Sequence, residues 1–331
     1  MSAEELPVDT TTTTPPQLSV VVPCHNEEEN IGPLLERLLP VMHGLERSFE
    51  VVLVDDGSRD RTLDRLREAH AAEPRVKYLA LSRNFGHEAA STAGLRHAMG
   101  DAVVLMDADL QDPPELIPTL VERWQEGFDL VFATRPEREG ESWFKRKSSA
   151  LFYRMMRRVV HFDFPADTGD FRLMARPVVE AFLRMPERNR FVRGMIAWTG
   201  FRTTSVEYRR EARHSGSTKY DFPKLFVLAM DALTGFSAVP LRLVSLLGLF
   251  VTLLAAVGTL WIVFNRLFLG IDIPGYAFLV TGVLFLGGVQ ILMLGAIGEY
   301  VGRIYVETQR RPLYLVRERG GLPRVDATET G

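Results

Sequence analysis

The sequence is poor in cysteine and nearly neutral in charge. Its 331 residues include one cysteine, Cys24, and carry a formal net charge of −3. A single cysteine cannot form an intramolecular disulfide or a cysteine-based metal cluster, which favours a reducing compartment. The charge gives no reason to expect nucleic acid as a partner. Residues 1–17 lack the apolar run of a signal peptide, so we expect a disordered tail and a chain whose bulk starts in the cytoplasm.

From Leu18 onward, short runs rich in valine and leucine alternate with stretches of helical periodicity. Continuous apolar runs indicate strands buried on both faces of a sheet, and their alternation with helices indicates parallel βαβ units. The sequence therefore predicts an α/β fold with an open, mostly parallel sheet. The expected strands are Leu18–Val22, Phe49–Val54, Val76–Leu81, Asp101–Met106 and Asp129–Ala133, and the expected helices are Asn30–Met42, Asp60–Glu73, Glu88–Met99 and Pro114–Gln125.

The first predicted strand is not followed by Gly-x-Gly-x-x-Gly, which argues against a dinucleotide-binding dehydrogenase. The lack of any glycine-rich loop there also argues against a sugar nucleotidyltransferase. Polar segments follow the strands instead, and ligands of open α/β sheets bind at the carboxyl ends of strands. These segments are Pro23–Glu27, Asp55–Ser58, Ser82–Asn84, Asp107–Asp112 and Thr134–Arg135.

The segment Asp107-Ala-Asp109 follows an apolar strand and is the strongest chemical signal. Two carboxylates one residue apart can hold a hard divalent cation such as Mg²⁺ or Mn²⁺. That ion can bind a diphosphate and neutralise the charge that develops as the diphosphate leaves. The alternative is an acidic turn in which Asp112 caps a helix that begins at Pro113.

A second acidic strand end accompanies the first. Asp55 and Asp56 should lie beside Asn26 and Glu27, because parallel strands end at one edge of a sheet. Together these groups can hydrogen-bond a ribose or the edge of a base. The alternative is ordinary turn chemistry, with a glycine in the turn and Asp60 as a helix N-cap.

Two apolar segments near the C-terminus, Leu243–Phe264 and Gly275–Gly298, are each long enough to cross a bilayer as a helix. The connection between them is short, so we expect a transmembrane hairpin. Arginines flank its outer ends, which places the catalytic half and both termini in the cytoplasm. Trp143–Val160 mixes basic and apolar residues, as does an interfacial amphipathic helix; a solvated helix packed on the domain is the alternative.

Three motifs, in this order and spacing, resemble glycosyltransferase family 2 with its GT-A, Rossmann-like fold: Val21–Glu27, Val54–Thr62 and Asp107–Glu115. The resemblance covers nearly the whole chain after the tail. Three later stretches, Thr168–Met174, Gly216–Tyr220 and Gly298–Tyr305, are similar to the polyprenyl-phosphate branch of that family. The bacterial type with two C-terminal membrane spans looks nearest.

The resemblance implies roles for individual residues. Asp109 would be the catalytic metal ligand, supported by Asp107 and Gln111. Asp170 would face the acceptor, in the segment Thr168–Met174 that resembles the acceptor loop of the family. The donor nucleotide would lie against Pro23, Asn26, Glu27, Asp55, Asp56, Asp107 and Arg135. Phosphate groups of the donor or the acceptor would lie against Arg146, Arg213, Ser217 and Lys219.

The implied reaction is inverting transfer of one sugar from a nucleotide-sugar, such as a UDP-linked hexose, to a polyprenyl phosphate at the cytoplasmic membrane face. A phosphate monoester is largely ionised at neutral pH, its second pKa being about 6, so positioning and charge neutralisation can suffice without a base at Asp170.

Two other functions share parts of this pattern. A processive polysaccharide synthase would share the acidic site but should have a Gln-x-x-Arg-Trp motif and more spans. A non-catalytic membrane-tethered scaffold would not need both acidic pairs. The predicted organisation is a tail (1–17), a GT-A domain (18–222), a juxtamembrane region (223–241), a two-helix hairpin (242–300) and a C-terminal tail (301–331), and the hairpin is compatible with a homo-oligomer.

Overall fold

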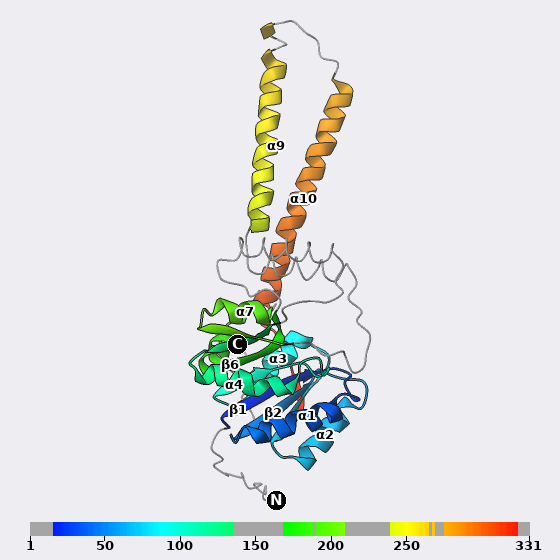
Figure 1. Cartoon of the computed structure of the whole chain (residues 1–331). Coiled ribbons are helices and arrows are strands. Elements are labelled where there is room, and N and C mark those ends of the chain that lie inside the picture. The colour runs from blue at the N-terminus through cyan, green and yellow to red at the C-terminus, as the bar shows by residue number, and fades with distance from the viewer. Residues whose placement is uncertain are drawn as a thin grey trace, which may run out of the picture.

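The computed structural model describes residues 16–134, 168–188, 190–208, 239–264, 267–268 and 275–323. Its described part consists of an α/β domain and two long helices, α9 and α10, that project together from one end of that domain (Figure 1). The predicted regions Trp143–Val160 and 223–238 lie outside the described residues, as does the N-terminal tail up to residue 15.

The described strands form one eight-stranded sheet in the order β7-β5-β6-β4-β1-β2-β3-β8. The pairs β4-β1, β1-β2, β2-β3 and β5-β7 are parallel. The strands are β1 Leu18–Cys24, β2 Phe49–Asp55, β3 Val76–Leu81, β4 Ala102–Leu105, β5 Leu130–Thr134, β6 Thr168–Ala175, β7 Thr203–Glu207 and β8 Val316–Gly320. The five predicted strands are confirmed as β1 to β5, each to within two residues of its bounds.

The helices cover both faces of the sheet, as the continuous apolar strands require. Helices α1, α2 and α4 pack on one face, and α3, α6 and α7 pack on the other. Their bounds are α1 Ile31–Gly44, α2 Thr62–Ala72, α3 His87–His97, α4 Ile117–Gln125 after a 3₁₀ turn at Pro114–Leu116, α6 Arg176–Leu183 and α7 Val192–Trp198. Gly94 lets α3 lie close to the sheet, since a Cβ there would overlap Val21.

Strand β6 departs from the simple parallel pattern. It runs antiparallel between β4 and β5, with Leu105 opposite Arg172. The chain from Thr168 to Met174 was expected to act as an acceptor loop, and it is a strand instead. Because β6 is antiparallel to β4, its first residues lie at the edge where β4 ends, so Asp170 reaches the carboxyl ends of the parallel strands.

Helices α9 (Val239–Phe264) and α10 (Tyr276–Thr308) pack on each other, and a Cβ at Gly248 would overlap Met293. Many of their large apolar side chains are exposed. By length and composition, Phe285–Thr308 is the one segment in the described ranges that can span a membrane, and Leu246–Gly258 is a shorter apolar stretch. We expected two spans, and the described residues contain one candidate for a span.

After α10 the chain returns to the α/β domain. Strand β8 pairs antiparallel with β3, and the Ser82 N–H donates to the Leu315 carbonyl oxygen over 2.8 Å. Tyr314 and Leu322, on either side of β8, are buried in the core. The stretch after residue 301, which we expected to be a tail, therefore contains the end of α10 and an edge strand of the sheet.

Candidate active site

Four strands bring polar residues to one edge of the sheet. β1, β2 and β4 end there, and the antiparallel β6 begins there. The predicted donor and metal residues that the structure describes lie at the ends of these strands or just after them. The predicted position of these residues at the carboxyl ends of the strands is thus confirmed.

The loops after β1 and β2 are joined through Asn26. This residue has a left-handed backbone, with φ +57°, and its N–H donates to Ser58 Oγ over 2.9 Å. Its Oδ1 accepts the N–H of Arg59, also over 2.9 Å. The Glu27 N–H donates to Thr62 Oγ1, and Glu27 Oε2 accepts from Asn30. Asn26 therefore has a structural role in this loop, whatever it contributes to a ligand.

Asp55, the last residue of β2, and Asp56, the residue after it, make different contacts. Asp56 accepts the backbone N–H groups of Phe85 (2.7 Å) and Gly86 (2.9 Å), so its carboxylate fixes the loop that leads into α3. Burial raises the pKa of Asp56 although these two hydrogen bonds act against the rise. Asp55 is fully buried; one oxygen accepts the Ser58 N–H, and Oδ2 has no hydrogen-bond partner within the described ranges.

Asp107 and Asp109 lie just beyond β4, on a loop that turns through a left-handed Leu110 with φ +60°. Asp109 is largely buried, and its Oδ1 accepts the Gln111 N–H over 3.1 Å. Burial and the negative charge of Asp170 raise the pKa of Asp107 to about 7. Neighbouring carboxylates repel each other when both are ionised. A divalent cation bound between them would offset this repulsion.

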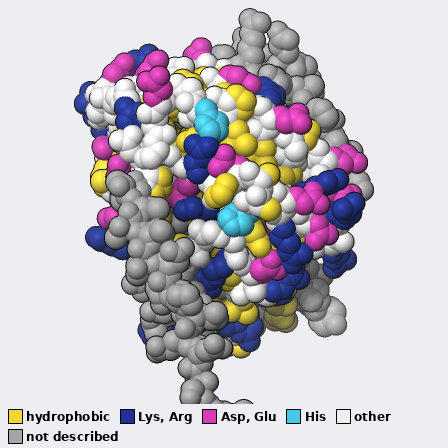
Figure 2. All heavy atoms as spheres, turned by 90° about the horizontal axis from the view of Figure 1, so that it is seen from below, with side chains coloured by type: hydrophobic (Ala, Val, Ile, Leu, Met, Phe, Trp, Pro, Cys, Tyr) yellow, Lys and Arg dark blue, Asp and Glu magenta, His cyan; other side chains and the backbone are white. Residues whose placement is uncertain are grey.

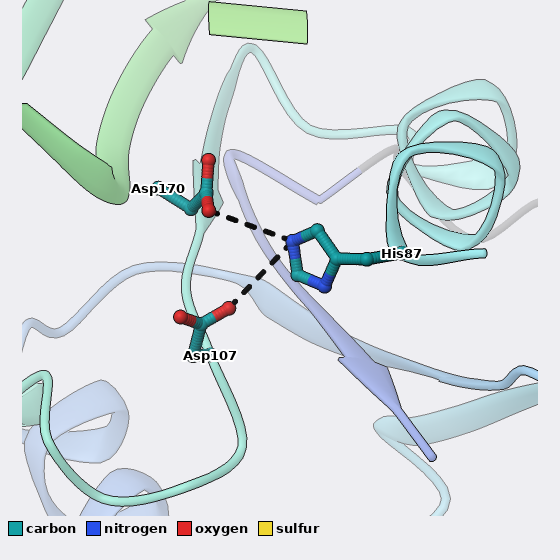
Figure 3. Close-up of side chains that lie close together, drawn as sticks. All are labelled: His87, Asp107 and Asp170. Atoms are coloured by element: carbon teal, nitrogen blue, oxygen red, sulfur yellow. Dashed lines mark ion pairs between the residues drawn. The ribbon is translucent and has the colours of Figure 1, made fainter. Parts of the chain in front are cut away.

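His87, the first residue of α3, lies between two of the acidic residues (Figure 3). Its Nε2 is 3.7 Å from Asp107 Oδ1 and 3.6 Å from Asp170 Oδ2. Burial disfavours the imidazolium, but the close contact with Asp170 and the negative charges of Asp107 and Asp170 outweigh it and raise the pKa of His87 to about 9. The three side chains also have the arrangement of a small metal site, with ligand atoms within 4.8 Å of one another.

The carboxylate of Asp170 accepts hydrogen bonds from two arginines. Arg193 of α7 donates from Nε to Oδ1 over 2.7 Å and from Nη2 to Oδ2 over 2.5 Å. Arg172 of β6, which is fully buried, donates from Nη2 to Oδ1 over 3.1 Å. Although burial alone would raise it, these cations and His87 hold the pKa of Asp170 well below its usual range. A carboxylate held in this way is a poor general base.

The first turn of α3 is also hydrogen-bonded to the first turn of α7. Glu88 Oε2 accepts the Val192 N–H over 3.2 Å, directly before Arg193 in the chain. Burial and the nearby charge of Asp170 raise the pKa of Glu88. His87 and Arg193 were not among the predicted site residues. Sequence reasoning therefore missed both contributions, since nothing local signals that they meet at Asp170.

Five predicted phosphate-binding or donor-binding residues lie outside the described residues: Arg135, Arg146, Arg213, Ser217 and Lys219. Their roles stay predictions. Pro23, near the end of β1, is buried, and the side chain of Gln111 is partly exposed. On the face of the α/β domain seen in Figure 2, described acidic and basic side chains are interspersed, in keeping with the near-neutral net charge.

Comparison with known proteins gives extended matches. The family model for Glycosyl transferase family 2 matches residues 19–183. The uncharacterized glycosyltransferase sll0501 of Synechocystis sp. is 46% identical over 306 residues, covering 92% of this chain and 96% of that protein. The bactoprenol glucosyl transferase of Shigella phage SfV is 41% identical over 301 residues, covering 91% of this chain and 98% of that protein. The Escherichia coli prophage bactoprenol glucosyl transferase homolog is also 41% identical, with the same coverage.

Proposed function

Because the chain belongs to glycosyltransferase family 2 and is a glycosyltransferase, we propose that it transfers one hexose, such as glucose, from a UDP-sugar to a polyprenyl phosphate. The observation that carries the proposal is the 41% identity to a bactoprenol glucosyl transferase over 91% of this chain. A match of that extent includes most of α9 and α10 as well as the α/β domain. It therefore relates the two long helices, and not the sheet alone, to an enzyme named a bactoprenol glucosyl transferase.

The donor nucleotide would lie at the ends of β1 and β2. Asp55 Oδ2 is a buried acceptor with no partner in the described part of the chain, and a hydroxyl or N–H of a nucleoside would satisfy it. Pro23 and Glu27 would complete the pocket. Asp56 would act by holding the loop of Phe85 and Gly86, because both of its oxygens already accept backbone N–H groups.

Asp107 and Asp109 would hold Mg²⁺ or Mn²⁺, with Gln111 beside them. The fit rests on the oxygen ligands that the loop after β4 offers. Burial is the main cause of the raised pKa of Asp107, and the charge of Asp170 adds to it. Asp170 is less suited to the ion because Arg172 and Arg193 already occupy its oxygens. The ion would neutralise the charge that develops on the departing diphosphate.

The reaction would be a direct displacement. A phosphate oxygen of the lipid forms a bond to the anomeric carbon, while the bond from that carbon to the donor diphosphate breaks and its electron pair leaves with the nucleoside diphosphate. No proton has to be removed from an ionised phosphate. This requirement agrees with Asp170, whose lowered pKa makes it a poor base.

The connectivity of the sheet supports a two-span hairpin in the cell membrane. β7 precedes α9 and β8 follows α10, yet both strands belong to one sheet. The intervening chain must therefore begin and end on the same side of any membrane, so it crosses an even number of times. If Phe285–Thr308 crosses, a second crossing is needed, and we assign it to α9, which contains the shorter apolar stretch Leu246–Gly258.

The test is transfer of radiolabelled sugar from a panel of nucleotide-sugars to undecaprenyl phosphate, with Mg²⁺, with Mn²⁺ or with chelator. We expect metal-dependent, acid-labile label in lipid. Asp109→Asn should lower the rate by at least about a hundredfold, because a lost ligand weakens both ion and diphosphate binding. Asp64→Asn is the matched control, since Asp64 is an exposed aspartate paired with Arg67 on the surface of α2.

Three outcomes would contradict the proposal. Label in a long polymer would favour a processive synthase. Nucleotide binding without any transfer would favour a scaffold. Equal rates in wild type and Asp109→Asn would remove Asp109 from the site.

A further inference from the structure

Tyr208 directly follows β7, and its side chain contacts the loop after β4. Its hydroxyl donates to Asp112 Oδ1 over 2.6 Å, although the two residues are 96 positions apart in the chain. Asp112 is 1% exposed, and a carboxylate this deeply buried is stable only where hydrogen bonds replace its hydration. The Tyr208 hydroxyl is thus one of the groups that keep Asp112 in place.

The loop of residues 107–112 depends on contacts of this kind because of its backbone at Leu110. This leucine has φ +60°, a left-handed conformation that is unfavourable for side chains other than glycine and persists only where the surroundings fix it. Before Leu110, Asp109 Oδ1 accepts a backbone N–H of the same loop. After it, Asp112 is bonded to Tyr208. Contacts on both sides of Leu110 therefore fix the loop.

Tyr208 is itself held by two strands of the sheet. Its N–H donates to the carbonyl oxygen of Thr134, the last residue of β5, over 3.0 Å. Its ring meets the ring of Phe171 in β6 edge-on, with centroids 6.0 Å apart and an interplanar angle of 89°. Phe171 is fully buried and directly follows Asp170 in the chain. Tyr208 therefore connects the loop after β4 to β5 and β6.

Asp112 also lies close to Asp107. Its negative charge adds to the rise in the pKa of Asp107, of which burial is the largest cause and the charge of Asp170 the next. A displacement of Asp112 would therefore change both the backbone path of the loop and the charge beside Asp107.

We propose that Tyr208 is a positioning residue of the metal site, which acts through Asp112 to hold the loop where the Asp107 and Asp109 carboxylates can share one divalent cation. This inference rests on the proposed function, in which those two aspartates bind Mg²⁺ or Mn²⁺. Loss of a group that supports metal ligands typically lowers metal affinity by about tenfold to a hundredfold. Removal of the Tyr208 hydroxyl should therefore weaken metal binding while both ligands remain.

The test compares Tyr208→Phe with the matched control Tyr78→Phe. Both tyrosines are 7% exposed, and the Tyr78 hydroxyl donates to Glu318 Oε1 over 2.7 Å near the opposite edge of the sheet. Each substitution thus removes one hydroxyl that donates to a carboxylate, but only Tyr208 contacts the loop after β4. Mn²⁺ binding to the detergent-solubilised protein is measured from the electron paramagnetic resonance signal of free Mn²⁺ in the presence of UDP. This readout does not depend on sugar transfer.

We expect Tyr208→Phe to raise the Kd for Mn²⁺ by about tenfold, and to raise the Mn²⁺ concentration for half-maximal transfer by a similar factor. The kcat at saturating Mn²⁺ should fall by less than about threefold, because the ligands are intact. Amide hydrogen exchange of the peptide that contains Gln111, measured without metal, should become faster. Tyr78→Phe should lower the melting temperature and leave Mn²⁺ affinity and this exchange unchanged. A merely structural role of Tyr208 would give the result of the control.

A double-mutant cycle with Asp112→Asn tests whether Tyr208 acts through Asp112. The amide oxygen of asparagine still accepts a hydrogen bond but carries no charge, so the bond to the Tyr208 hydroxyl should be weaker. We expect Tyr208→Phe to change the Kd for Mn²⁺ by less than about threefold in the Asp112→Asn background. An equal effect in both backgrounds would show that Tyr208 does not act through Asp112.

The remaining outcomes separate this inference from the proposed function. If wild type binds no Mn²⁺ in the presence of UDP and its sugar transfer needs no metal, the proposed metal site and this inference are both wrong. If wild type binds Mn²⁺ and the Kd of Tyr208→Phe stays within about twofold of the wild-type value, the inference alone is wrong. If Tyr208→Phe does not fold, Asp112→Glu, which keeps the charge and moves the carboxylate relative to Tyr208, decides by the same criterion.

Discussion

At the scale of single residues, Gly57 lies where the loop after β2 contacts the loop before α3. Its backbone is left-handed, with φ +62°, and a Cβ there would overlap backbone atoms of Arg83 and Asn84. The loop of Gly57 thus lies directly against the loop that Asp56 holds. Glycine is required here both by conformation and by space.

We therefore expect Gly57→Ala to destabilise the protein by more than about 1 kcal/mol, since the native conformation and the close contact both exclude a side chain. Gly32→Ala is the control, because a Cβ at this helical position in α1 meets no atom within 4 Å and alanine favours the helix. The measurement is thermal unfolding in detergent. A melting temperature for Gly57→Ala equal to or above that of Gly32→Ala would show that the two loops can separate without cost.

Single residues were predictable from the sequence where their chemistry is local. Asp107 and Asp109 follow an apolar strand, so their position at the sheet edge could be derived from the order of elements. His87 and Arg193 could not be found in this way. One looks like an ordinary helix start and the other like a surface arginine until the fold brings both to Asp170. The predicted contact of Asp56 with a ligand stays a prediction, and the structure adds that its oxygens accept two backbone N–H groups.

At the scale of elements, β8 covers the outer edge of β3 and becomes the edge of the sheet itself. Its sequence, Val-Arg-Glu-Arg-Gly, is typical of edge strands that use charge to prevent further pairing. Tyr78 of β3 donates to Glu318 Oε1 over 2.7 Å, and Arg67 of α2 also donates to Glu318. Gly320 faces the ring of Tyr78, which a Cβ would overlap.

Gly320→Val should therefore separate the end of β8 from β3. We expect faster amide hydrogen exchange in both strands and a melting temperature a few degrees lower, as for a loss of about 1–2 kcal/mol. Arg317→Val places the same side chain at an exposed neighbouring position of the strand and should leave exchange in β3 unchanged. Identical exchange in the two variants would mean that Tyr78 simply moves aside.

The parallel βαβ elements were predictable because strands and helices there are neighbours in sequence and have clear periodicity. β6, β7 and β8 were not predicted as strands. β6 was interpreted as an acceptor loop, and its pairing between β4 and β5 depends on residues far away in the chain. β8 has no apolar pattern, since three of its five residues are charged. Its place is set by pairing with β3, which no local rule predicts.

At the scale of the whole molecule, the single cysteine allows a direct test of the hairpin. Cys24 is buried, and burial raises the pKa of its thiol, so it should react slowly with maleimides. Gly275, at the start of α10, and Thr308, at its end, are both exposed. In right-side-out membrane vesicles, an impermeant maleimide should label Gly275→Cys and not Thr308→Cys. Both should be labelled after permeabilisation.

The wild-type protein, labelled in parallel, gives the background from Cys24. If neither introduced cysteine is labelled before permeabilisation, the helical pair does not cross the membrane. If Thr308→Cys is labelled from outside, the catalytic domain is on the opposite side from the one proposed. Either result would require the lipid phosphate to be reached by another route.

The return of β8 to the sheet also sets an order for biosynthesis. The ribosome makes β8 after both long helices, so β3 has an uncovered edge for as long as those helices are being synthesised. An uncovered edge can pair with another chain, and a nascent protein whose helices fail to insert would keep that edge exposed. If the helical pair inserts into the membrane as proposed, completion of the sheet is coupled to that insertion, and a chain that fails to insert would also be the one most open to aggregation and proteolysis.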